Sequence, residues 1–274
     1  MKTLIVPTDF SPIATNAMNY AVDMALSINA SVLLLHVYQV PVTFSEVPVT
    51  VVTVEEMKKM SEEKLEELKQ GIKKNTAGKI KVYTEARLGD VVDEIEALCK
   101  SIQPFAVIMG TKGASVVERL FLGSSTLTAI RHLTWPVIIV PPGATFNGIR
   151  KIGFACDFKK VVETTPVKFI KDVVKEFNAE LHVLNVDYNN KQFTPATPEE
   201  SLLLHTMLEE LKPGYHFINN PNVEEGINKF AEENSLGLII VIPKKHKMLD
   251  GLFQKSHSKE FAFHSHIPIL AVHE

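Results

Sequence analysis

Residues 107–126 read VIMGTKGASVVERLFLGSST, in which an apolar strand runs into a loop that carries Gly110 and Gly113. Further on, a third glycine, Gly123, stands at the start of a helix beside Ser124 and Ser125. Glycine adopts positive φ and lets the backbone approach a ligand without a Cβ atom in the way. The N–H groups at a helix start favour an anion, and the hydroxyl groups of residues 124–126 add donors there. The stretch therefore predicts a phosphate-binding loop.

Short apolar runs alternate with amphipathic runs on both sides of this loop. Strands are expected at residues 4–7, 31–38, 80–86, 105–109 and 135–141, and helices at about 12–28, 54–74, 90–103 and 123–133. Ser11 and Pro12 supply a helix cap and a proline in the first helical turn. The alternation predicts an α/β fold, a doubly wound and mainly parallel sheet with helices on both faces. Such sheets bind ligands at the carboxyl ends of the strands, where the strand order reverses.

The pattern restarts after a proline- and glycine-containing linker at residues 141–148. Residues 151–158 echo 2–10, with Asp157 in the place of Asp9. The further echoes are 178–186 of 29–37, 222–231 of 89–98 and 267–272 of 135–140. The sequence therefore predicts a tandem repeat with two domains, residues 1–143 and 149–274, each holding a five-stranded sheet.

The glycine spacing differs from the better-known phosphate loops. Neither Gly-x4-Gly-Lys-Ser/Thr nor Gly-x-Gly-x-x-Gly occurs in the chain. The spacing found, Gly-x2-Gly-x9-Gly-Ser, resembles the nucleotide-binding signature of the universal stress proteins, in the subgroup that binds ATP. The resemblance covers nearly the whole chain as two copies. The alternative is an ordinary glycine turn followed by a serine helix cap.

This resemblance implies an ATP site in the first copy. Asp9 would contact the nucleoside, and the backbone of Val37 would meet the adenine edge. Gly110 and Gly113 would admit the ribose and the phosphates. The remaining expected contacts are the phosphate-holding Gly123, Ser124 and Ser125, the pocket walls Pro7, Thr8 and Met109, and Lys112 in the loop. The alternative for Asp9 is an ordinary turn residue.

The second copy lacks the three glycines. Aligned on residues 238–242, it has Pro243, His246 and Ser256 in the places of Gly110, Gly113 and Gly123. Since proline has no N–H to offer a phosphate, we expect no ATP binding of the family kind there. The resemblance implies instead that this copy replaces the second subunit of a dimer, with the final strands paired as an intramolecular pseudo-dimer. Anion binding through the lysines of residues 244–255 is the alternative.

Composition excludes some classes of function. The net charge of the 274 residues is −3, which gives no electrostatic footprint for nucleic acid. No apolar run reaches the roughly 18 residues needed to span a membrane, and the first residues do not resemble a signal peptide. Cys99 and Cys156 have no metal or redox spacing and are expected to be buried thiols. A soluble cytoplasmic protein is expected.

Histidines gather in the second copy, but without close ligand spacing. Residues 246, 257, 264, 266 and 273 are the histidines around its loop and last strand. Zinc binds imidazole readily, so a metal site stays open as an alternative, and no metal ligand is assigned.

Binding is easier to support than catalysis. Phosphoryl transfer needs a cationic clamp, metal ligands and a group that orients water, and Lys112, Glu118 and Arg119 have no diagnostic arrangement. We therefore expect a regulatory, stress-response protein that binds ATP, with or without Mg²⁺, and hydrolyses it slowly at most. One alternative is an adenine nucleotide α-hydrolase, although those enzymes usually carry Ser-Gly-Gly-x-Asp-Ser where residues 7–11 read PTDFS. Another is a structural dimerisation module with a vestigial loop. A homodimer and the protein partner stay open.

Overall fold

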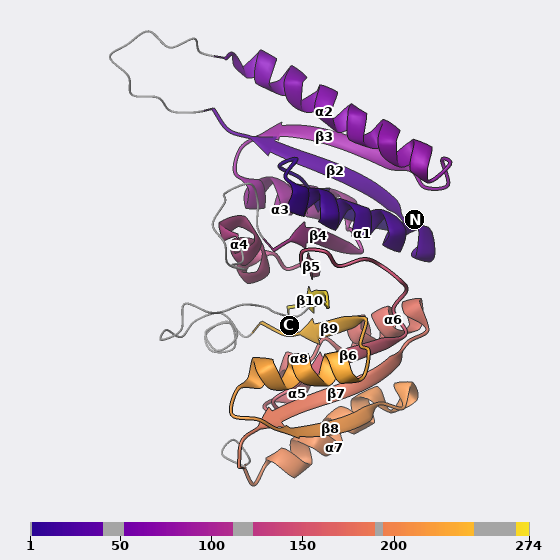
Figure 1. Ribbon diagram of the computed structural model, residues 1–274. Helices are drawn as coiled ribbons and strands as arrows, with labels where there is room; N and C mark the ends of the chain where they lie inside the picture. The colour runs from indigo at the N-terminus through magenta and orange to yellow at the C-terminus, as the bar shows by residue number, and fades with distance from the viewer. Residues whose placement is uncertain (1, 41–51, 112–122, 190–193, 244–266, 274) are drawn as a thin grey trace.

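The computed structural model describes residues 2–40, 52–111, 123–189, 194–243 and 267–273. Within these ranges ten strands form one continuous sheet, in the order β3-β2-β1-β4-β5-β10-β9-β6-β7-β8 (Figure 1). Strands β1 to β5 and their helices make one half of the sheet, and β6 to β10 make the other. The fold is therefore α/β, with two doubly wound halves of five mainly parallel strands each.

The first half follows the predicted alternation closely. Its elements are β1 (Thr3–Pro7), α1 (Pro12–Ile28), β2 (Ser31–Tyr38), α2 (Val54–Asn75), β3 (Val82–Leu88), α3 (Val91–Ile102), β4 (Ala106–Gly110), α4 (Ser124–His132) and β5 (Val137–Val140). The largest shifts are in β3 and β5, each of which begins two residues later than expected. Strand β4 includes Gly110, although the apolar pattern ends one residue earlier.

Helix α1 shows how local signals set the boundaries of an element. The Ser11 hydroxyl accepts from the Ala14 N–H at 3.2 Å, and Pro12 occupies the first turn. The helix ends at Asn29 in the left-handed conformation, with φ 51°. The buried Ala17 and Ala21 lie on its inner face, and such small side chains allow a helix to lie close to the sheet.

Both faces of the sheet are covered, which explains why its strands are apolar almost throughout. In β1, Leu4 and Val6 join one buried cluster together with residues of α1 and α2. Ile5 points to the opposite face and joins a second cluster with residues of α3 and α4. Both clusters continue into the second half of the chain.

The second half repeats the strand order of the first, because β8-β7-β6-β9-β10 corresponds to β3-β2-β1-β4-β5. Its elements are β6 (Lys151–Ala155), α5 (Val161–Thr164), α6 (Val167–Phe177), β7 (Glu180–Asp187), α7 (Thr197–Leu208), the 3-10 turn η1 (Glu209–Leu211), β8 (Gly214–Asn219), α8 (Val223–Glu233), β9 (Leu238–Val241) and β10 (Ile269–Ala271). The first half has one helix, α1, between its first two strands. The second half has two helices, α5 and α6, in the corresponding place. Pro166 separates them, because the residue before a proline is driven to an extended conformation and Thr165 adopts it.

Strands β5 and β10 join the two halves as antiparallel neighbours. Val137 pairs with Ala271, and Ile139 pairs with Ile269. This pairing of the two final strands is the one that the family resemblance implies. The predicted linker lies between β5 and β6, so the chain leaves the first half beside the junction and begins the second.

Among the described residues, no helix combines the length and the apolar character that crossing a membrane requires.

Candidate functional site

The carboxyl ends of three neighbouring parallel strands bring several of the predicted residues to one edge of the sheet. Asp9 follows β1, Val37 lies near the end of β2, and Gly110 is the last residue of β4. Strands β1 and β4 are adjacent, and the strand order reverses between them. Ligands of doubly wound sheets bind at such a reversal. The fold therefore gathers these three positions where a ligand is expected.

A tight turn after β1 presents Asp9. The Phe10 N–H donates to the Thr8 hydroxyl at 3.0 Å, and the Ser11 N–H donates to Asp9 Oδ1 at 3.0 Å. Phe10 adopts the left-handed conformation, with φ 65°. Thr8 is buried and Asp9 is exposed, while Pro7 is half-buried as the last residue of β1. Thr8 therefore supports the turn from inside, and Asp9 is the member of this group that reaches the surface.

At the end of β2, Val37 is half-buried and lies opposite Arg87 of β3. The Arg87 guanidinium donates to Glu85 at 2.7 Å and to Glu94 at 3.1 Å. Burial opposes the charge of Arg87, but the hydrogen bonds to the two carboxylates outweigh it and raise its pKa. Sequence reasoning missed this ionic group. The sequence holds no signal for it, because the contact between Arg87 and Glu94 depends on how α3 packs against β3.

Gly110 has a packing role that is independent of any ligand. Met109, beside it in β4, is buried. A Cβ atom built on Gly110 would lie 2.6 Å from Ile13 Cγ2 and 3.0 Å from the Ile13 carbonyl oxygen. The beginning of α1 therefore approaches β4 so closely that only glycine fits. The sequence analysis attributed this glycine to ribose and phosphate approach, and the close contact with α1 gives it a second reason.

The start of α4 is tied to the end of β4 by two hydrogen bonds. The Gly123 N–H donates to the Thr111 carbonyl oxygen at 2.5 Å, and the Thr126 hydroxyl donates to the Gly110 carbonyl oxygen at 3.0 Å. Thr126 is buried, so its hydroxyl serves the fold, and the expectation that it adds a phosphate donor is wrong. The Gly123 amide is likewise directed at Thr111. The amides of residues 124–126 are the ones that a helix start leaves without intrahelical acceptors.

Ser124 is exposed and Ser125 is half-buried at this helix start. Gly123 caps the helix with an extended backbone and without a side-chain hydrogen bond. The first turn of α4 thus keeps the features that suit an anion, namely N–H groups, two serines and the positive end of the dipole. Lys112 and Gly113 lie outside the described residues.

Strand registers correct one alignment of the second half. Leu4 pairs with Ala106 in the first half, and its counterpart Ile152 pairs with Leu238 in the second. Ile242 therefore stands where Gly110 stands, and Pro243 takes the place of Thr111. The sequence alignment was one residue off because the apolar pattern of β4 ends before Gly110. His246 and Ser256 lie outside the described residues, as do residues 244–255 with their lysines.

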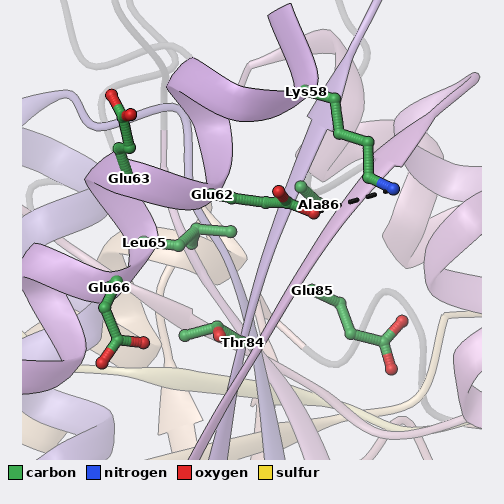
Figure 2. Close-up of a pocket in the computed structure, with 8 residues that line it drawn as sticks. All are labelled: Lys58, Glu62, Glu63, Leu65, Glu66, Thr84, Glu85 and Ala86. Carbon is green, nitrogen blue, oxygen red and sulfur yellow. Dashed lines mark ion pairs between the residues drawn. The ribbon is translucent and has the colours of Figure 1, made fainter. Parts of the chain in front are cut away.

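A groove of about 570 Å³ lies between α2 and β3 (Figure 2). It is lined by Lys58, Glu62, Glu63, Leu65, Glu66, Thr84, Glu85 and Ala86. Each of its four carboxylates has a described cation nearby. The ion pairs are Lys58–Glu62, Lys59–Glu63, Lys69–Glu66 and Arg87–Glu85. Because these charges are already paired, we assign no ligand to the groove.

The surroundings of Cys99, Cys156 and His273 fit a structural role for these side chains. Cys99 is buried, and burial raises the pKa of its thiol to about 12. Cys156 is only partly buried, which corrects the expectation that both thiols are enclosed. The His273 ring hydrogen-bonds the Ile130 carbonyl oxygen at 2.7 Å, near the end of α4. Within the described part of the chain, no three histidine, cysteine or acidic side chains gather into a metal site.

Comparison with known proteins adds family evidence to this geometry. The model of the universal stress protein family matches residues 1–141. A universal stress protein of Methanocaldococcus jannaschii is 28% identical over 139 residues, which cover 51% of this chain and 81% of the relative. The solved structure of a universal stress protein from Archaeoglobus fulgidus aligns over 99% of this chain and 98% of its own, with a TM-score of 0.72 and 21% identity. A putative universal stress protein from Pseudomonas aeruginosa aligns over 99% and 93%, with a TM-score of 0.60 and 13% identity. At these identities the two structures speak for the fold alone.

Proposed function

Because the chain belongs to the universal stress protein family, we propose that its first half binds ATP at the carboxyl edge of β1, β2 and β4. The observation that carries the proposal is the position of Asp9 and the start of α4 on the two sides of the strand-order reversal. Asp9 follows β1, and two hydrogen bonds fasten α4 to the end of β4. Neighbouring strands lie only about 5 Å apart, so one nucleotide spans the two features.

The charges at the two features support one direction for the nucleotide. A carboxylate repels phosphate and accepts hydrogen bonds from hydroxyl groups, so Asp9 belongs at the ribose. The first turn of α4 attracts an anion through its amides and dipole, and Ser124 and Ser125 lie in that turn. The nucleoside therefore lies over β1 and β2 with its adenine near Val37, and the triphosphate extends toward α4. Mg²⁺ would accompany the triphosphate.

We further propose that the second half is a built-in partner and does not bind ATP in the same way. Ile242 and Pro243 stand at the positions of Gly110 and Thr111, so the strand end has a bulky side chain and a residue without an N–H. Strand β10 pairs with β5 where a second subunit would pair. The chain is thus a tandem form, with domains at residues 1–143 and 149–274 that act as a pseudo-dimer.

The role we propose is regulatory and belongs to the cytoplasmic stress response, with slow hydrolysis at most. Binding needs the amides and the nucleoside contact, whereas phosphoryl transfer also needs a positioned clamp and a group that orients water. Occupancy by ATP would then change the contacts that the protein makes with its partner.

The second half carries Asp157 in the place of Asp9, and this pair of aspartates allows a matched experiment. Calorimetric titration with ATP and Mg²⁺ would compare the wild type, Asp9→Asn and Asp157→Asn, since asparagine keeps the turn but removes the charge. We expect Asp9→Asn to weaken binding about tenfold or more, because it loses charge-assisted hydrogen bonds. Asp157→Asn should leave affinity unchanged. Failure of the wild type to bind ATP would reject the proposal, and an effect confined to Asp157→Asn would assign the site to the second half.

A further inference from the structure

Three hydrogen bonds from backbone N–H groups shape the turn that presents Asp9. The Thr8 N–H donates to the Leu35 carbonyl oxygen at 2.8 Å, which continues the β1–β2 ladder by one residue. The Thr8 hydroxyl then accepts from Phe10, and Asp9 accepts from Ser11. Phe10 adopts a left-handed conformation that L side chains rarely take. A turn of this kind needs support from outside its own four residues.

The same turn recurs after β6. The Cys156 N–H donates to the Leu184 carbonyl oxygen at 2.9 Å, and the Phe158 N–H donates to Cys156 Sγ at 3.4 Å. The Lys159 N–H donates to Asp157 Oδ1 at 3.2 Å. Phe158 is also left-handed, with φ 50°. The two halves therefore keep one turn geometry although most of its side chains differ.

One side chain from the neighbouring strand holds each turn. His36 Nδ1 lies 2.7 Å from the Thr8 carbonyl oxygen, and because a carbonyl only accepts, Nδ1 donates. In the second half the Asn185 amide donates to the Cys156 carbonyl oxygen at 2.9 Å. The strand registers make the two donors equivalent, because His36 follows Leu35 and Asn185 follows Leu184. Histidine and asparagine share little here except an N–H donor at the same point.

The Thr8 carbonyl, which accepts the hydrogen bond from His36, leads directly into Asp9. The Thr8 C=O belongs to the peptide unit that joins Thr8 to Asp9, and a peptide unit is planar. A hydrogen bond to that oxygen therefore fixes the plane from which the Asp9 backbone continues. The His36 ring also contacts the Phe10 ring, with centroids 4.5 Å apart, and Lys64 of α2 lies over the same ring at 5.2 Å. His36 thus contacts the residues on both sides of Asp9, and its hydrogen bond is to the peptide unit that leads into Asp9.

We propose that His36 is a positioning residue of the nucleotide site, which acts through Asp9 by donating to the Thr8 carbonyl. Its importance for ATP rests on the function proposed above, whereas its hold on the turn does not. Asn185 performs the same task in the half that we expect not to bind ATP. The hydrogen bond, and not the imidazole as such, is the required property.

The test compares His36→Asn with His36→Leu, two side chains of similar branching that differ in the N–H donor. The readouts are the affinity for ATP by calorimetry and the hydrogen exchange of the Phe10 and Ser11 amides by NMR. Loss of one hydrogen bond should make His36→Leu bind ATP about tenfold more weakly and speed exchange by a similar factor. His36→Asn should stay within about twofold of the wild type in both, since the donor is kept. Asn185→Leu should speed exchange at Phe158 and Lys159 while leaving ATP affinity unchanged.

Rescue by asparagine separates positioning from general packing, because a merely structural histidine would be replaced no better by asparagine than by leucine. The proposal is overturned if His36→Leu retains both the slow exchange and the affinity, or if His36→Asn behaves like His36→Leu. His36→Ala is a second donor-free variant if the leucine variant does not fold. If the wild type does not bind ATP, the proposed function fails, and the exchange data still decide whether His36 holds the turn.

Discussion

The Nδ1 atom of His182 lies 3.0 Å from the Nε2 atom of His216, across the neighbouring strands β7 and β8. Phe230 of α8 packs against both rings, with centroid distances of 6.4 Å to His182 and 4.5 Å to His216. Burial lowers the pKa of His182, and the charges of His216 and Lys151 lower it further, against a partial opposing effect of Glu180. Burial also lowers the pKa of His216. The hydrogen bond needs one imidazole to accept, so it is lost when both are protonated.

This pair predicts a loss of stability on acidification. Both folded-state pKa values are depressed below the ordinary value of 6.5, so the unfolded chain takes up protons first as the pH falls. The stabilising contribution is therefore present above about pH 6.5 and is lost as the pH falls toward the folded-state values. Urea unfolding between pH 7.5 and 5 should show a free energy that falls less steeply in His182→Leu than in the wild type, by about one proton. The assignment would be contradicted if the free energy of unfolding fell equally steeply with pH in the wild type and in His182→Leu. It would also be contradicted if the imidazole NMR signals of His182 and His216 titrated above pH 6.5.

Gly110→Ala should destabilise the fold through α1. The new Cβ atom would meet Ile13 Cγ2 and the Ile13 carbonyl oxygen, and overpacking of this kind costs about 1–3 kcal/mol of unfolding free energy. Ile13→Ala in the same chain removes Cγ2 and should recover part of the loss. The matched control is Gly71→Ala in α2, where nothing lies within 4 Å of the added atom. It should raise stability by about 0.5–1 kcal/mol, because alanine favours the helix. A neutral Gly110→Ala would show that α1 shifts freely away from β4.

These results show what local patterns in the sequence can and cannot provide. The Ser11–Pro12 start of α1 and the apolar strands are local signals, and the elements they predict are confirmed. The contact of Gly110 with Ile13 and the bond from Thr126 to Gly110 join segments distant in sequence, so no local pattern contains them. The site assignments at Asp9 and Val37 came from family resemblance. Those at Ser124 and Ser125 came from the local pattern of glycines and helix start as well, and all four stay predictions. Lys112 and Gly113 lie outside the described residues.

Gly113→Val should abolish ATP binding while the fold persists. The expectation follows from the glycine spacing, because a β-branched side chain would occupy the space through which phosphate approaches the backbone. Native mass spectrometry should find one ATP per wild-type chain and none on the variant, with matching circular dichroism spectra. The Gly71→Ala variant is again the control and should keep its nucleotide. Undiminished binding by Gly113→Val would exclude the proposed grip on the phosphates.

Hydrolysis should be slow in the wild type. Since Glu118 lies in the glycine loop without a diagnostic arrangement, Glu118→Gln should leave the rate of ADP release unchanged. Chromatography of the products over several hours would measure this rate. Several turnovers per minute in the wild type, lost in Glu118→Gln, would favour an enzyme of the α-hydrolase kind.

The hydroxyls at the start of α4 should separate into a structural one and two binding ones. Thr126→Val keeps the shape of the side chain but leaves the Gly110 carbonyl oxygen without this donor, and losing such a bond costs about 1–2 kcal/mol of stability. ATP affinity should stay the same, because the Thr126 hydroxyl points at the strand. Ser124→Ala with Ser125→Ala should do the reverse, weakening ATP binding by about tenfold with little change in the melting temperature. Calorimetric titration and thermal unfolding on the same samples test both halves of the statement. A Thr126→Val variant that loses ATP at unchanged stability would return this hydroxyl to the phosphate site and make the bond to Gly110 incidental.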